Sequence, residues 1–156
     1  MIKNVVRDWM SQNPVTVDPK TTLPEAHKIM KDRRIRRLPV MEQGRLVGIV
    51  TLGDIREAEP SDATTLSIFE LHYLLAKLTI GEIMTREPIT ISSDATIRDA
   101  AKMMLQNKIG GLPVIDDGKL VGIITESDIF RVLAQEAEPS AETLKNEYLK
   151  FEQATG

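Results

Sequence analysis

The sequence predicts a mixed α/β (α+β) protein built from two copies of one β-α-β-β-α unit. Three observations lead to this fold class. Residues 10–56 and 84–130 repeat each other. Each copy alternates short β-branched runs with amphipathic helical patterns, and each is too small to bury its own apolar face. We therefore expect the two copies to pack on each other, with the functional site where they meet.

The repeat has a constant offset of 74 residues, because Met10 aligns with Met84 and no gap follows. Of the 47 aligned positions (56 − 10 + 1), 19 carry identical residues. The identities include Pro14/Pro88, Thr22/Thr96, Ala26/Ala100, Met30/Met104, residues 38–40 and 112–114, and Gly44/Gly118. So many matches in one register indicate a true internal repeat.

Each unit is expected to begin with a short strand and a capped helix. The strands are residues 15–17 and 89–91, and a proline precedes each. The helices open on a capping box, in which the Thr hydroxyl covers the N3 amide and an acidic residue lies in the first turn. The two boxes pair Thr22 with Glu25 and Thr96 with Asp99. Helical spacing predicts two buried faces, one with Leu23, Ala26 and Met30 and one with Ile97, Ala101 and Met104.

A hairpin and a second helix complete the unit. The hairpin strands are residues 38–41 with 46–50, and residues 112–115 with 120–124. Gly44 and Gly118 supply the positive φ that such turns need. The last helix is expected to begin at Thr51 in the first copy and at Thr125 in the second.

The segment between the units differs from both copies. Pro60 should end the preceding helix after Ala58, and apolar residues from Leu66 to Leu78 then cover most faces of a further helix. This helix either caps the core of its own chain or forms a subunit interface, since contiguous apolar surface usually meets a partner. After the second unit, residues 141–151 predict a more polar peripheral helix.

Composition excludes several classes of protein. The 156 residues suffice for a stable core, and a hydrophobic content of 42% is typical of a soluble globular protein. A net charge of −3 argues against general binding to nucleic-acid polymers or acidic membranes. The lack of cysteine excludes disulfides, thiol catalysis and thiolate metal sites. With no signal-peptide core and no apolar run near the ~18 residues of a membrane span, we expect a cytoplasmic protein.

The order of these motifs, with Leu-Pro-Val opening each hairpin and Gly-x-x-Thr-x-x-Asp closing it, resembles the CBS domain. Two such units in tandem, each with a Met-x-x-x-Pro start, resemble a CBS pair, or Bateman module. The chain is similar to small stand-alone proteins of the acetoin-utilisation type. The expected domains are CBS domain 1 at 5–57, an insert with an apolar helix at 58–78, CBS domain 2 at 79–131, and a C-terminal peripheral helix or tail at 132–156.

The resemblance implies three further properties. The two units would pack with pseudo-twofold symmetry, leaving a cleft on each side of the sheet. Adenine nucleotides or related adenosyl ligands would bind in those clefts. Modules of this kind commonly pair into disc-shaped dimers, so a homodimer is expected.

The pairs Thr51 with Asp54 and Thr125 with Asp128 have two compatible interpretations. As N-cap and N3 residues they satisfy the free amides of a helix and suit its dipole. The CBS resemblance adds a binding role, in which the carboxylate accepts both ribose hydroxyls while the Thr hydroxyl and nearby amides face phosphate. We expect both roles together in each copy.

Arg36 and Arg37 precede the first hairpin, where CBS units that bind nucleotide often place a basic residue toward the phosphates. Strand alternation would send one side chain inward and the other outward, although both could belong to a solvated basic run. The second copy has Gly110 and Gly111, which removes the cation there and leaves room for a bulky ligand or close backbone approach. We therefore predict two unequal sites: one near Asp54 for a phosphate-bearing ligand, and a weaker or different one in the second copy.

Other residues carry weaker signals. Thr16 and Thr90 are expected to line the base pockets, with backbone groups recognising adenine. His27 and His72 have no Cys or carboxylate partner at ligand spacing, so we expect them at the surface or at an interface. Trp9 is expected to anchor the N-terminal arm. The sequence has no phosphate loop, nucleophile elbow or triad.

The sequence thus predicts a non-enzymatic sensor that binds AMP, ADP, ATP or S-adenosylmethionine between its two units. Occupancy would change the tilt of the units or of two paired chains, with no required cofactor or metal and with the regulated partner protein left open. The alternative is a ligand-free dimerisation or protein-interaction module that uses the insert helix. A small hydrolase is the third hypothesis, and it is weak because no residue set offers a nucleophile with a positioned base.

Overall fold

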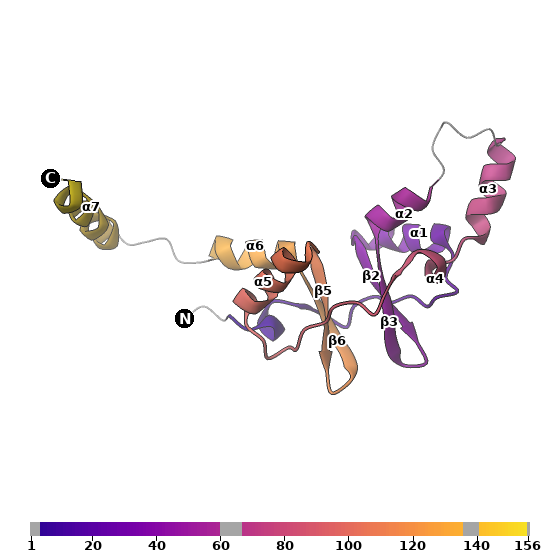
Figure 1. Ribbon diagram of the computed structural model, residues 1–156, viewed down its shortest axis with the longest axis horizontal. Coiled ribbons are helices and arrows are strands. Elements are labelled where there is room, and N and C mark those ends of the chain that lie inside the picture. The colour runs from indigo at the N-terminus through magenta and orange to yellow at the C-terminus, as the bar shows by residue number, and fades with distance from the viewer. Residues whose placement is uncertain (1–3, 60–66, 136–140, 156) are drawn as a thin grey trace.

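The computed structural model describes residues 4–59, 67–135 and 141–155. Two three-stranded sheets lie next to each other, with strand orders β2-β3-β4 and β1-β6-β5. Figure 1 shows α1 and α2 beside the first sheet and α5 and α6 beside the second. This mixed arrangement of helices and strands in two similar halves confirms the predicted fold class.

Each half contains one helix, a hairpin and a second helix. The first half has α1 (Leu23–Arg33), β2 (Arg37–Glu42), β3 (Arg45–Thr51) and α2 (Leu52–Ala58). The second half has α5 (Ile97–Asn107), β5 (Gly111–Asp116), β6 (Lys119–Thr125) and α6 (Glu126–Gln135). The remaining elements are η1 (Val6–Asp8), β1 (Ser11–Gln12), α3 (Ile68–Lys77), α4 (Ile80–Ile83), β4 (Thr85–Arg86) and α7 (Ala141–Thr155).

Local sequence explains where these elements begin and turn. Both predicted capping boxes are present, at the N-termini of α1 and α5. The hairpins turn through paired positive-φ residues, with φ of +50° at Gln43 and +76° at Gly44 in the first, as two-residue turns of this kind require. The buried face of α5 contains Ala100, and not the predicted Ala101, which is half-buried. Pro60 and Leu66 lie outside the described residues.

The expected first strand of each unit is wrong in extent. Residues 15–17 and 89–91 contribute only one parallel bridge each, Val17 with Val40 and Ile91 with Val114. The antiparallel third strand of each sheet comes instead from the other half of the chain. Strand β1 pairs with β6, and β4 pairs with β3. The two halves therefore exchange their entry segments.

The exchange is reciprocal at the level of single hydrogen bonds. Val6 N donates to Ala95 O at 2.9 Å, and its repeat counterpart Ile80 N donates to Thr21 O at 2.8 Å. Each bond joins an entry segment to the loop before the helix of the opposite half. Because every such bond has a partner at the offset of 74 residues, the pseudo-twofold relation expected from the resemblance holds in detail.

Two apolar cores result, one in each half. Leu38, Val40 and Val50 are buried in the first core, which is completed by Ile80 from the linker side of the chain. Leu112, Val114 and Ile124 are buried in the second, which is completed by Val6 from the N-terminal arm. Trp9 packs against the second core, as its predicted anchoring role requires. The packing unit therefore differs from the unit that repeats in the sequence.

Helix α3, which lies between the two copies of the repeat, has no buried residue. Ser67 and Glu70 form a capping box at the start of α3. A serine followed three residues later by a glutamate at the start of an apolar run favours this arrangement. The apolar side chains of α3 are largely exposed, with Phe69 at 87% and Ile68 at 71%. Helix α7 lies apart from both sheets (Figure 1).

Candidate functional site

The seam between the halves brings the start of each hairpin next to the start of its second helix. Arg37 pairs with Thr51 across β2 and β3, and Gly111 pairs with Thr125 across β5 and β6. A backbone bond of 2.8 Å from Leu52 N to Arg36 O closes the first corner. The equivalent bond from Glu126 N to Gly110 O, at 3.0 Å, closes the second. The predicted Thr residues thus stand directly beside the predicted arginines or the glycines that replace them.

The side chain of Arg37 crosses the seam into the second half. A Cβ atom added at Gly110 would lie 2.2 Å from Nη2 of Arg37, and one added at Gly111 would lie 2.6 Å from its Cδ. Arg36, in contrast, is exposed, so the strand alternation expected for the two arginines is confirmed. The room that the glycines leave is therefore occupied by an arginine from the other copy.

This crossing corrects one expectation about the second copy. The exchange of Arg for Gly at positions 110 and 111 does not remove the cation, because Arg37 supplies it from the first copy. Burial at the seam lowers the pKa of Arg37, the nearby Glu126 carboxylate opposes that shift, and Arg36 adds to it. An arginine stays protonated despite such a shift, so the seam carries a half-buried positive charge beside Glu126.

Asp54 lies at the start of α2 and is half-buried. Its Oδ2 accepts a hydrogen bond of 2.9 Å from Thr51 N, and Asp54 N donates to Thr51 Oγ1 at 3.1 Å. Among the described residues, no hydrogen bond or ion pair reaches Oδ1 of Asp54. The capping role expected for this pair is therefore present, and one carboxylate oxygen remains available.

Asp128 lies at the equivalent place in α6 but is only 2% exposed. Its Oδ2 accepts from Thr125 N at 2.8 Å and from Thr125 Oγ1 at 3.4 Å. Its Oδ1 accepts a short hydrogen bond from Nη2 of Arg131, one helical turn further on. Both oxygens of Asp128 are therefore engaged. Arg131 is not among the site residues predicted from the sequence, although its i, i+3 spacing from an acidic residue was a usable signal.

Thr16 lies in a separate place from these residues. It lines an open cavity of about 630 Å³ between the loop before α1, α1 itself and the end of β2. The other lining residues are Val17, Asp18, Thr21, Glu25, Lys28, Ile29 and Met41. Thr51 and Asp54 are not among them, and Thr90 is exposed on the second copy. The cavity is therefore distinct from the seam corners that hold the paired Thr and Asp residues.

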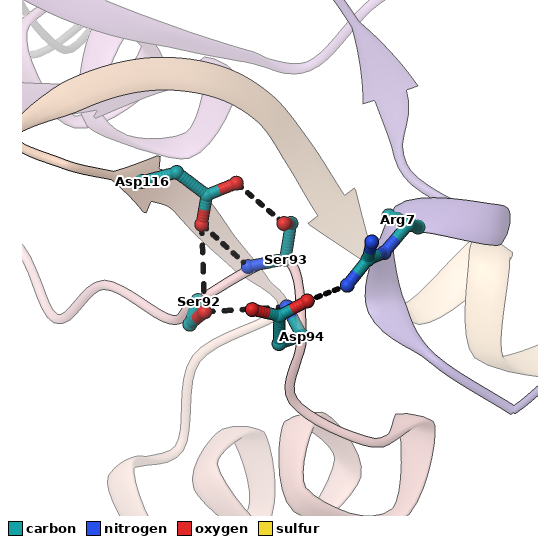
Figure 2. Close-up of polar contacts among 5 residues, drawn as sticks. All are labelled: Arg7, Ser92, Ser93, Asp94 and Asp116. Carbon is teal, nitrogen blue, oxygen red and sulfur yellow. Dashed lines mark hydrogen bonds and ion pairs between the residues drawn. The ribbon is translucent and has the colours of Figure 1, made fainter.

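A hydrogen-bonded cluster that the sequence analysis did not single out closes the outer end of β5 (Figure 2). Asp116 accepts from Ser93 N at 3.0 Å, from the Ser93 hydroxyl through a short bond, and from the Ser92 hydroxyl at 3.4 Å. These bonds, chiefly the one from the Ser93 hydroxyl, lower the pKa of Asp116. Asp94 forms an ion pair with Arg7 of the N-terminal arm. The cluster links the N-terminal arm to the second half of the protein, and we therefore assign it a structural role.

The described part of the chain also bears on metal binding, membrane crossing and the placement of the two histidines. Within it, no group of three or more His, Cys, Asp or Glu side chains could hold a metal ion. None of its helices has the length and apolarity that crossing a membrane demands. His27 is 46% exposed and lies 3.7 Å from Glu59, and His72 is exposed, as expected for surface histidines.

Comparison with known proteins gives a match in each half. The family model for the CBS domain matches residues 6–61 and 80–135. A CBS domain-containing protein of Dictyostelium discoideum is 35% identical over 140 residues, which cover 88% of this chain and 97% of that protein. Several longer relatives match only in part, since the chain spans between 23% and 47% of four of them.

Solved structures with the same fold contain adenosyl ligands. The CBS domain pair of MJ0100, in complex with 5′-methylthioadenosine and S-adenosyl-L-methionine, has a TM-score of 0.70 and 35% identity, covering 86% of this chain and 98% of that one. CBSX2 in complex with AMP has a TM-score of 0.69 and 30% identity, covering 85% and 98%. A structure described as an acetoin utilization protein (AcuB) from Vibrio cholerae has a TM-score of 0.69 and 29% identity, covering 89% and 100%. The predicted resemblance to stand-alone proteins of that type is confirmed.

Proposed function

The chain belongs to the CBS-domain family, with one CBS domain in each half, and from this premise we propose that it is a non-catalytic regulatory module that binds an adenine nucleotide at the seam. The observation that carries this proposal is the position of the Arg37 side chain at the seam between the two units. Arg37 is a half-buried cation that crosses from one unit to the other and lies beside the start of α6. A cation at this place can attract the phosphate group of a ligand bound to either unit.

The paired Thr and Asp residues support the same location. Asp54 stands next to the start of β2 and keeps one carboxylate oxygen free of protein partners among the described residues. A carboxylate accepts hydrogen bonds from hydroxyl donors, which is the chemistry that ribose recognition needs. The relatives solved with AMP and with S-adenosyl-L-methionine support an adenosyl ligand, and Arg37 favours one that carries phosphate.

Calorimetric titration of two probes that differ only at the 5′ group tests this proposal. We expect AMP to bind more tightly than 5′-methylthioadenosine, which has no phosphate. Arg37→Gln should weaken AMP binding about tenfold or more, since hydrogen bonds to charged groups contribute about 1.5–3 kcal/mol. The same variant should leave the affinity for 5′-methylthioadenosine nearly unchanged.

Arg45→Gln is the matched control, because Arg45 is an exposed arginine at the turn end of the same hairpin. It should leave both affinities at the wild-type value. Absence of binding heat for AMP, ADP, ATP, S-adenosylmethionine and 5′-methylthioadenosine alike would refute the adenosyl-binding function. Equal losses for AMP in the two arginine variants would refute the role of Arg37.

A homodimer that uses the insert helix is the second candidate function, and the surface of α3 favours it. Phe69, Glu70, Tyr73 and Leu74 line a shallow groove of about 420 Å³. Phe69 and Tyr73 are 87% and 61% exposed, and clustered exposed aromatic side chains are typical of a surface that meets another protein. We propose that this face meets a second copy of the chain.

Light scattering after size-exclusion chromatography decides this point. If α3 forms the contact, Phe69→Ser should convert dimer to monomer, while Phe130→Ser should not. Phe130 is the matched control because it is an exposed phenylalanine, at 63%, on the opposite half of the molecule. A monomer at all concentrations in the wild type, or dissociation only in Phe130→Ser, would exclude α3 as the dimer contact.

A further inference from the structure

The two carboxylates at the helix starts of the repeat, Asp54 and Asp128, differ in accessibility although they hold equivalent positions in the chain. Asp54 is half-buried and uses one oxygen for its own helix start. Asp128 is 2% exposed and has both oxygens engaged. A ligand hydroxyl could approach the free oxygen of Asp54 as it stands, whereas Asp128 is buried and already accepts a hydrogen bond at each oxygen. The cause of this difference lies one turn along each helix.

Arg131 covers Asp128, and its counterpart cannot cover Asp54. The residue at the repeat offset from Arg131 is Glu57, since 131 − 74 = 57. Glutamate carries the same charge as Asp54 and repels it, so no ion pair of this kind can form on α2. On α6 the i, i+3 spacing lets the guanidinium reach Oδ1 of Asp128. One charge reversal therefore separates an open carboxylate from a closed one.

The contact on α6 is suited to open again. The side chain of Arg131 is 58% exposed, while that of Asp128 is 3% exposed. The guanidinium therefore has room to move into water. The cost of leaving the buried carboxylate without its partner is offset when a ligand hydroxyl donates to the same oxygen. The Asp128 carboxylate would stay in place, since Thr125 N holds its other oxygen. Movement of the Arg131 side chain would free Oδ1 of Asp128 from its hydrogen-bond donor.

We propose that Arg131 is a gate over the second ligand site, so that the site at Asp54 fills first and the site at Asp128 fills only when Arg131 is displaced. This inference rests on the proposed adenosyl-binding function. A ligand hydroxyl and the guanidinium compete for the same oxygen, and the apparent affinity falls by the fraction of molecules in which the gate is open. The two sites then differ in affinity even for a ligand whose other contacts are the same at both.

The test exchanges the gate between the two helices. Each site is measured alone, with Asp54→Asn silencing the first site or Asp128→Asn silencing the second. In the Asp54→Asn background, Arg131→Met should tighten binding at the second site about fivefold. In the Asp128→Asn background, Glu57→Arg should install the same contact on α2 and weaken binding at the first site by a similar factor.

The probe is 5′-methylthioadenosine, followed by calorimetry. Because this probe is uncharged, loss of the Arg131 charge cannot act through attraction to a phosphate. Glu57→Gln is the matched control for the first site, since it removes the glutamate without supplying a donor for an ion pair with Asp54. It should leave the affinity near the wild-type value.

The outcomes separate the gate from the function on which it rests. No binding of the probe to the wild-type chain would overturn the adenosyl-binding function itself. Binding to the wild type with unchanged affinities in Arg131→Met and Glu57→Arg would overturn the gate alone. Weaker binding in Arg131→Met would also overturn it, because Arg131 would then hold the ligand. Should Arg131→Met fail to fold, as judged by circular dichroism, Glu57→Arg decides the question at a site that Arg131 does not touch.

Discussion

The two halves of this protein share a backbone plan and differ at the edges that face each other. At the start of its hairpin the first half has two arginines, and the second half has Gly110 and Gly111. The helix that follows carries Glu57 in the first half and Arg131 in the second. Considered one copy at a time, these look like independent departures from a repeat. In the structure they form complementary pairs, because each one determines what its neighbour can contact.

The seam shows this complementarity most clearly. Gly110 and Gly111 are small where Arg37 is large, and the side chain of Arg37 fills the space above them. A repeat whose two copies were identical could not do this, since two arginines would meet at the pseudo-twofold axis and repel each other. The asymmetry therefore gives one shared cation in place of two competing ones. Three comparisons between the halves measure how much of the molecule is symmetric and where the symmetry ends.

The largest effect is expected where the halves are most alike. A Cβ atom at Gly48 would lie 2.5 Å from Sδ of Met84 and 2.9 Å from the backbone oxygen of Thr85. At Gly122 the corresponding distances to Met10 and Ser11 are 2.5 Å and 2.8 Å. Gly48→Ala and Gly122→Ala should each lower the free energy of unfolding by about 1–3 kcal/mol, because the exchanged strand has to move away. Urea denaturation measures both values.

Gly53→Ala is the control for these substitutions. A Cβ atom at Gly53 would meet only Thr51 Oγ1, at 3.6 Å, and alanine is favoured over glycine inside a helix. The variant should be as stable as the wild type or slightly more so. A loss at Gly48 without an equal loss at Gly122 would show that the exchange of entry segments is not reciprocal in solution.

The symmetric features are those that the sequence allowed us to predict. Leu38 and Leu112 are buried because they stand at the same place in the same pattern. The capping boxes and turns follow from local chemistry that needs no information about the rest of the chain. The exchange of β1 and β4 could not be predicted, because two-residue strands carry almost no periodic signal. The first strand of each unit was overestimated for a related reason, since residues 15–17 look like a strand without being paired as one.

The sequence predicts which residues stand at the candidate site, but it does not predict what their side chains contact. The residues Thr51, Asp54, Thr125 and Asp128 do stand at the starts of α2 and α6, as expected. The destination of the Arg37 side chain depends on what lies across the seam, and sequence spacing within one copy says nothing about that. The contact between Arg131 and Asp128 likewise depends on the side-chain conformation that Arg131 adopts. The part that could not be predicted is therefore the part that distinguishes the two sites.

A smaller effect is expected at the asymmetric seam itself. Gly111→Ala should lower the free energy of unfolding by about 1 kcal/mol or less, since an added Cβ would lie 2.6 Å from Cδ of a flexible arginine side chain. The cost should largely disappear in an Arg37→Ala background, because the group that the new methyl meets is then absent. The coupling in this double-mutant cycle should be at least about 0.5 kcal/mol. Additive effects would mean that Arg37 does not occupy the space above Gly111 in solution.

The smallest effect concerns the outer ends of the halves, where Asp116 in the second corresponds to Glu42 in the first. Asp116 accepts hydrogen bonds from Ser92 and Ser93 (Figure 2), whereas no hydrogen bond joins Glu42 to the matching loop among the described residues. The lowered pKa of Asp116 means that the folded protein binds its carboxylate in the charged form. The Asp116 carboxylate therefore makes its full contribution to the free energy of unfolding above the pKa of an aspartate in the unfolded chain, about 3.9. This contribution is lost as the pH falls through the lower pKa of Asp116 in the folded protein. Asp116→Asn should thus be less stable than the wild type at pH 7, and the difference should shrink toward zero under strong acid.

The Glu42→Gln variant supplies the comparison. It removes the carboxylate at the equivalent position of the first half, where no hydrogen-bonded cluster like that of Asp116 is lost from the described residues. Urea denaturation from pH 7 down to about pH 2.5 should show a converging pair of curves for Asp116→Asn and the wild type. The cluster also ties Arg7 and the N-terminal arm to the second half through Asp94. If both variants gave the same profile, the two outer ends would be equivalent in energy, and the asymmetry of this protein would be confined to its seam.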